Sequence, residues 1–100
     1  MSAVYSFDSE LWEWTSKTSW FFLDVPESDA DDIEERFGRS AAGFGSVRVE
    51  VTIGSSTWQT SIFPSKEKET YVLPVKKAIR TAEQLVAGSV ARVELTVIID

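Results

Sequence analysis

The clearest pattern along the chain is an alternation of apolar and polar residues between Val47 and Ile53. A period of two predicts a β-strand with one buried face. The same pattern returns over positions 57–63, after a Gly54-Ser55 pair that favours a turn. The two segments therefore predict neighbouring strands joined by a tight connection.

Four further segments have the composition of strands. Positions 5–15 are rich in aromatic residues, and positions 19–25 are continuously apolar, so these two segments predict a hairpin around a turn at 16–18. A short strand over 71–73 stops at a proline, and positions 90–99 place alternate apolar residues on one face. The chain thus predicts six strands.

Two segments predict helices. The first covers 29–37, with Ser28 as its N-cap and Gly38 in the position that follows a helix C-terminus. The second is predicted by the helical spacing of apolar residues from Ala78 to Val86 and stops at Gly88. Because each helix follows a strand and a proline, we expect one helix at each end of a small barrel.

The order of these elements predicts one α+β domain, mainly β, over residues 1–100: a six-stranded barrel capped by two α-helices. A closed barrel hides its strand edges, so we expect a monomer. The N-terminal segment lacks the basic start and apolar core of a signal peptide, and no apolar run approaches the length of a membrane span. We therefore expect a cytoplasmic protein with no membrane partner.

Composition narrows the chemistry. The chain has no cysteine and no histidine, which excludes thiolate catalysis, Ser-His-Asp triads and cysteine–histidine zinc sites. We predict no cofactor, no metal site and no catalytic residue. The formal net charge of -6 disfavours binding to nucleic acid, which depends on cation density.

A cationic group at the start of the second predicted helix breaks a local rule, because cations there oppose the helix dipole. The predicted anion-binding residues are Lys76, Lys77, Arg80 and Lys66. A simpler interpretation, which we weight more heavily, is that these side chains pair with Glu67, Glu69 and Glu83 or remain solvated. The acidic run at 27–35 is better explained by helix-start electrostatics than by a metal site.

Three other residues are candidates for a ligand or partner face: Arg48, Gln59 and Phe44. Arg48 and Gln59 fall on the polar faces of two adjacent predicted strands, where cross-strand pairing is the simpler interpretation. Phe44 lies between two glycines, which favour a turn that folds the ring onto the core. The four tryptophans are mostly expected to fill the core, although one exposed ring would mark a binding surface.

The segments GFGSVRVEVTIG, WQTSIFP and YVLPVKKAIR, preceded by LWEW and WFFLDVPES, resemble domain-of-unknown-function family 1905. The resemblance covers about Tyr5 to Ile98 and implies a pseudo-barrel of the double-split type with two helices. It implies no established activity. The fold type is shared at a distance with AbrB/MazE-like DNA-binding proteins, and fold alone does not transfer function.

Taken together, these observations favour a noncatalytic binding module whose partner is a small anionic ligand or a protein. Nucleic-acid binding by analogy with AbrB/MazE-like barrels is the first alternative. A carboxylate- or lysine-based enzyme is the second, because Asp, Glu, Lys, Ser, Thr, Tyr and Arg remain available for chemistry.

Overall fold

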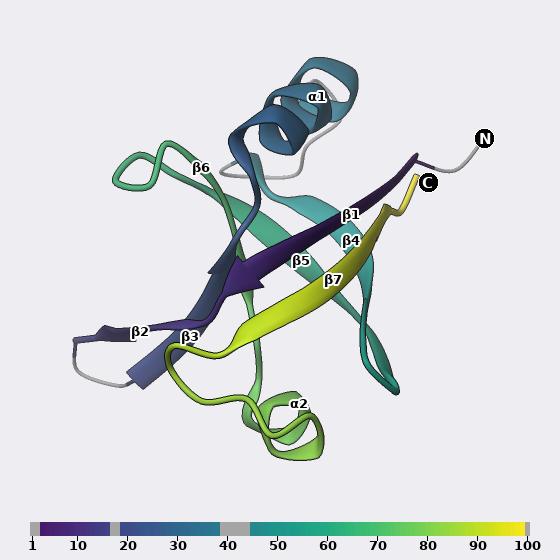
Figure 1. The fold of residues 1–100 in the computed structure, drawn as a ribbon. Helices are drawn as coiled ribbons and strands as arrows, with labels where there is room; N and C mark the ends of the chain where they lie inside the picture. The colour runs from purple at the N-terminus through teal and green to yellow at the C-terminus, as the bar shows by residue number, and fades with distance from the viewer. Residues whose placement is uncertain (1–2, 17–18, 39–44, 100) are drawn as a thin grey trace.

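The computed structural model describes residues 3–16, 19–38 and 45–99 of the chain. Its elements are, in order, β1 (Ala3–Glu10), β2 (Trp12–Thr15), β3 (Ser19–Asp24), α1 (Glu27–Phe37), β4 (Val47–Ile53), β5 (Ser56–Ser65), β6 (Thr70–Pro74), α2 (Lys77–Ala82) and β7 (Val90–Val97). The strands pair antiparallel in the order β1-β7-β4-β5-β6-β3-β2. The sheet curls into a barrel-like wall with α1 at one end and α2 at the other (Figure 1), which confirms the mainly β, α+β prediction.

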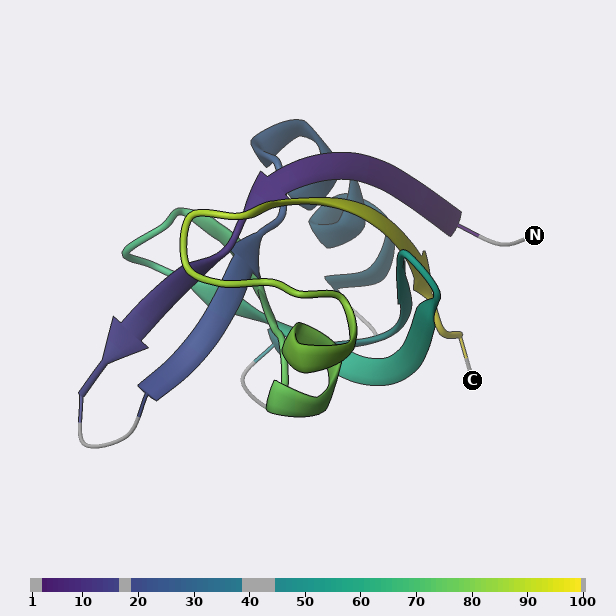
Figure 2. The same cartoon turned by 60° about the horizontal axis from the view of Figure 1, so that its bottom comes forward.

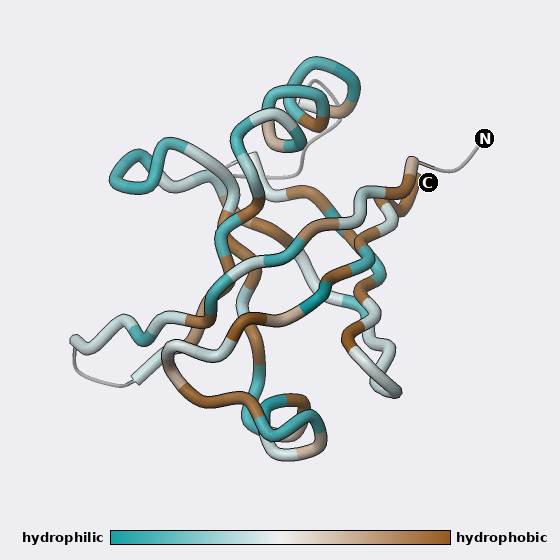
Figure 3. The backbone as a smooth tube through the Cα atoms, in the orientation of Figure 1, coloured by the Kyte–Doolittle hydropathy of each residue, from teal (hydrophilic) through white to brown (hydrophobic). Residues whose placement is uncertain are grey.

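The core lies on the concave side of this wall. Alternation along β4 buries Val49 and Val51, and the paired strand β7 contributes Val93 and Leu95, all with no exposed surface. Figure 3 shows the same alternation of apolar and polar positions along the strands. The period of two in the sequence thus selects the face that each strand turns inward.

The first predicted strand is two strands, which is why the sheet has seven strands and not six. The break falls at Leu11, which is fully buried. Its amide donates to the Ser89 carbonyl and its carbonyl accepts from the Gly88 amide, each at 2.8 Å. Before this point β1 pairs with β7, and after it β2 pairs with β3. The predicted hairpin is therefore formed by β2 and β3, which extend away from the body (Figure 2).

The first helix begins two residues earlier than predicted. Pro26 occupies the N-cap position, and its carbonyl already accepts the Ala30 amide at 2.8 Å, so Ser28 lies within the helix and caps nothing. Gly38 is also right-handed, with φ −58°, instead of the left-handed conformation that the prediction implied. Ala30 and Ile33 bury the inner side of the helix.

The second helix has six residues and ends well before Val86. Gln84 adopts a left-handed φ of 56°, its amide bonds to the Thr81 carbonyl, and the Leu85 amide bonds to the Arg80 carbonyl. This is the hydrogen-bond pattern of a Schellman motif, with glutamine at the position usually given to glycine. Gly88, the predicted stop, lies in the following turn with φ 93°.

Replacing this left-handed residue, Gln84→Gly, should increase the free energy of unfolding by up to about 1 kcal/mol, because glycine adopts the conformation without the steric cost of a Cβ. Gln84→Ala is the matched control and should bring no gain. Urea unfolding monitored by circular dichroism measures both. A glycine variant no more stable than the alanine variant would contradict the assignment.

A second prediction concerns Tyr5, which joins β1 to α1 by donating its hydroxyl proton to Asp32, with Arg36 beside the pair. Burial, followed by the bond to Asp32, raises the pKa of Tyr5 to about 12. An unfolded tyrosine ionises at about pH 10. The neutral hydroxyl therefore contributes stability that is complete below about pH 10 and is lost as pH rises towards about 12.

The wild-type protein should lose more unfolding free energy than the variant Tyr5→Phe across this alkaline window. Chemical unfolding at a series of pH values measures the difference between the two slopes, and titration of lysines cancels in the comparison. Parallel slopes would show that the tyrosine hydroxyl is not held neutral by the fold.

Candidate functional site

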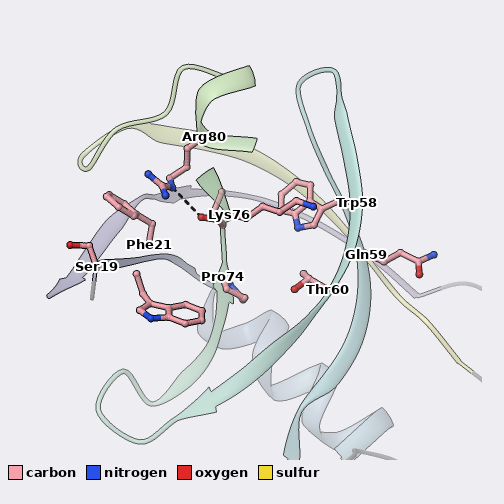
Figure 4. Close-up of a pocket in the computed structure, with 10 residues that line it drawn as sticks. Ser19, Phe21, Trp58, Gln59, Thr60, Pro74, Lys76 and Arg80 are labelled. Atoms are coloured by element: carbon pink, nitrogen blue, oxygen red, sulfur yellow. Dashed lines mark hydrogen bonds between the residues drawn. The ribbon is translucent and has the colours of Figure 1, made fainter. Parts of the chain in front are cut away.

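A cleft of about 320 Å³ opens in the barrel wall on the α2 side, where β5 separates from β6 (Figure 4). The two strands pair only from Phe63 opposite Val72 to Ser65 opposite Thr70. Beyond these pairs β5 stays with β4, whereas β6 pairs with β3 and then leads into α2. The lining residues come from these elements: Ser19, Trp20, Phe21, Trp58, Gln59, Thr60, Pro74, Val75, Lys76 and Arg80.

Aromatic side chains give the cleft its apolar surface. Trp58 belongs to the core cluster and is only 8% exposed, so it forms an inner wall. Trp20 is 52% exposed and lies at the mouth, and Phe21 is partly buried and packs against the core. Rings at several depths suit a flat apolar group that enters from outside.

Arg80 is held in place by two contacts. Its Nε donates to the Val75 carbonyl at 3.2 Å, and its guanidinium carbon lies 3.9 Å from the centre of the Phe21 ring. Among the described residues, none of the ion pairs includes Arg80, and no acidic residue lines the cleft. The guanidinium therefore borders the cleft with no carboxylate partner among the described residues.

Lys76 is the second cation of the cleft. It is the N-cap residue of α2, has an extended backbone, and carries an exposed side chain that extends towards Trp58, whereas Arg80 leans over Phe21 (Figure 4). Lys77 lies next to it in sequence but borders a different hollow, with Thr81 and Leu85. The structure thus brings together Lys76 and Arg80, and Arg80 borders both hollows.

Lys66, the fourth predicted anion ligand, lies elsewhere. It borders a hollow between α1 and the β5–β6 loop, together with Asp31, Glu34 and Glu69. Its position follows from the sheet register, because the loop is at the opposite end of β6 from α2. Of the predicted set, this residue does not join the cleft.

The predicted partner face is also rearranged. Arg48 lies opposite Ser61 on the polar outer side of the β4–β5 pair, and Gln59 lies opposite Glu50. Gln59 borders the cleft, yet Figure 4 shows its side chain directed away from the other lining residues. Phe44 lies outside the described residues.

The simpler interpretation of the cations was that they pair with Glu67, Glu69 and Glu83 or remain solvated, and the structure shows where these carboxylates lie. Glu83 instead accepts hydrogen bonds from the Ser56 and Ser55 hydroxyls, at 2.6 and 3.1 Å, which hold its pKa below the usual value. These bonds fasten the end of α2 to the β4–β5 turn. In the described ranges, neither Glu67 nor Glu69 forms an ion pair with Lys76, Lys77 or Arg80.

Sequence reasoning expected most tryptophans in the core and one exposed ring at a binding surface, but it did not identify which tryptophan is exposed. The β2–β3 register places Trp14 opposite Trp20 at the end of a two-stranded hairpin, where both are about half exposed. The serine and threonine residues around the predicted turn could have indicated that these two rings are exposed, because a polar hairpin tip has little core in which to bury a ring.

The cleft combines cations, hydroxyls and aromatic rings, an arrangement that fits binding of an anion with an apolar body. None of the helices in the described part of the chain is long and apolar enough to cross a membrane. No curated protein matches the chain. A family model does match, over residues 7–95, and the chain therefore belongs to the DUF1905 family, a domain of unknown function.

Proposed function

We propose that this protein is a noncatalytic binding module whose cleft holds a small organic anion. The supporting observation is the pair Lys76 and Arg80, which line an aromatic cleft with no carboxylate among its described lining residues. In a chain with a net charge of -6, such a local reversal of charge favours an anionic ligand.

The cleft also indicates what kind of anion fits. A volume of about 320 Å³ is at the lower end of the range for small-molecule sites. A carboxylate or phosphate would receive charge-assisted hydrogen bonds from the Arg80 guanidinium, which are among the strongest available to a protein. The rings of Trp20 and Trp58 would contact the apolar part of the ligand. An aromatic carboxylate meets both requirements.

The two alternatives from the sequence have less support. A nucleic-acid partner would meet a protein of net charge -6, and the described lining of this cleft contains two cations, Lys76 and Arg80. An enzyme based on paired carboxylates would need acids in the cleft, and its described lining has none.

Titration with benzoate and, separately, inorganic phosphate tests the proposal. Benzoate should shift the NMR signals of the Arg80 Nε–H and the Trp58 indole, and Arg80→Gln should weaken its affinity by about tenfold or more, as expected when a charged hydrogen bond is lost. Lys76→Gln should weaken binding less, because its exposed ammonium is screened by solvent.

Lys66→Gln is the matched control, since it removes the same kind of charge from a different hollow. It should leave benzoate affinity unchanged. Circular dichroism checks that each variant is folded. If neither anion moves signals around the cleft, or if Lys66→Gln weakens binding as much as Arg80→Gln, the proposed site is wrong.

A further inference from the structure

We infer that the anion held in this cleft is the C-terminal carboxylate of an extended peptide, which pairs with the open edge of β5. This inference rests on the proposed function and adds a partner class to it. It is carried by the direction in which backbone groups point along β5, a feature separate from the cations.

Backbone direction along β5 follows from a single hydrogen bond. The Ile98 amide donates to the Arg48 carbonyl at 2.9 Å, so Arg48 turns its backbone groups towards the β7 side of β4. Successive residues in a strand point these groups to opposite sides. Val49 therefore faces β5, its partner Thr60 faces β4, and the flanking residues Gln59 and Ser61 face the cleft.

The same alternation explains why β6 does not occupy this edge. Continuing the β5–β6 register beyond Phe63 opposite Val72 would place Ser61 opposite Pro74. Pro74 has no amide hydrogen, so it donates no ladder bond to β5. One residue later the Val75 amide donates to the Phe21 carbonyl at 2.9 Å, which holds the chain against β3.

The result is a vacant strand position beside Gln59 and Ser61. No ladder pair in the described ranges covers β5 from Ser56 to Ile62 on this side. Unpaired strand edges are templates for another strand, and extended peptides bind to such edges in several recognition domains. Three or four residues in extended form, at about 3.4 Å a residue, would cover the part of this edge around Gln59 and Ser61.

The cations set the direction of the peptide. A peptide antiparallel to β5 runs the same way as β6, because β6 is itself antiparallel to β5. β6 ends at Pro74 and leads into Val75 and Lys76. The C-terminus of the peptide would therefore arrive beside Lys76 and Arg80, where its carboxylate would meet their positive charges.

Side chains of the peptide would alternate between two environments, because successive residues of a strand point to opposite faces. One set would point inward towards Trp58, and the other outward towards Trp20 at the mouth. Apolar residues at alternate positions fit the inner set. A competing explanation for the position of Lys76 is that its charge only protects the open edge of β5, since charged residues commonly discourage strand pairing.

The test uses the acetylated peptide Ac-Thr-Val-Thr-Val with a free C-terminus, its C-terminal amide, and a version N-methylated at the central valine and threonine. The free acid should bind and slow hydrogen exchange of the Gln59 and Ser61 amides. The amide should bind about tenfold more weakly through loss of the charged contact, and the N-methylated peptide should lose a similar factor through lost backbone hydrogen bonds.

A protein variant tests the same edge. Gln59→Pro removes an amide that faces the cleft and leaves the bonds between β4 and Thr60 in place. The affinity of this variant for the free-acid peptide should therefore be about tenfold lower than that of the wild type, while benzoate still binds. Gln59→Ala keeps the amide and should bind like wild type. If Gln59→Pro does not fold, the N-methylated peptide alone decides the question.

The outcomes separate the two proposals. Binding of benzoate without binding of the peptide, or equal affinity of the N-methylated and unmethylated peptides, overturns the inference and leaves the anion site intact. Failure of benzoate, phosphate and peptide to move the Arg80 signal overturns both.

Discussion

One stretch of chain, from Ala3 to Thr15, supplies the strands at both ends of the sheet. Its first part, β1, pairs with β7, and its second part, β2, pairs with β3. The barrel-like shape depends on this double pairing. The change of partner happens at Leu11, whose two backbone groups are bonded to the segment that precedes β7. The Ser9 hydroxyl then donates to the Asp24 carbonyl at 2.8 Å and links β1 to β3. Because these bonds join segments far apart in sequence, they draw the sheet into a curve around one core.

The curve cannot close uniformly, and Pro74 decides where it stays open. A proline in a strand leaves one ladder position without a donor. Here that position falls between β5 and the β6–α2 junction, so the gap has an apolar floor from Trp58 and a cationic rim from Lys76 and Arg80. The short helix α2 is fastened on both sides of the gap, through Arg80 to β6 and β3, and through Glu83 to the β4–β5 turn.

The sequence was most informative where structure is local. Alternation over Val47–Ile53 gave the bounds of β4, and two of the four cations predicted to bind an anion, Lys76 and Arg80, line one cleft. It was least informative where distant partners decide. The strand break at Leu11 depends on Ser89 and Gly88, and the position of Lys66 depends on sheet register. The start of α1 and the end of α2 also escaped prediction, since the Pro26 carbonyl and the left-handed Gln84 set them through backbone bonds.

The fixation of Arg80 has a consequence for affinity. A free arginine side chain in water explores many rotamers, and ordering it on binding costs up to about 2 kcal/mol. In this fold the stacking on Phe21 and the bond to Val75 have already ordered it before any ligand arrives. The entropy of that side chain is therefore lost during folding and not during binding. This part of the cleft is preorganised, so an anion that contacted the Arg80 guanidinium would not have to order that side chain on binding.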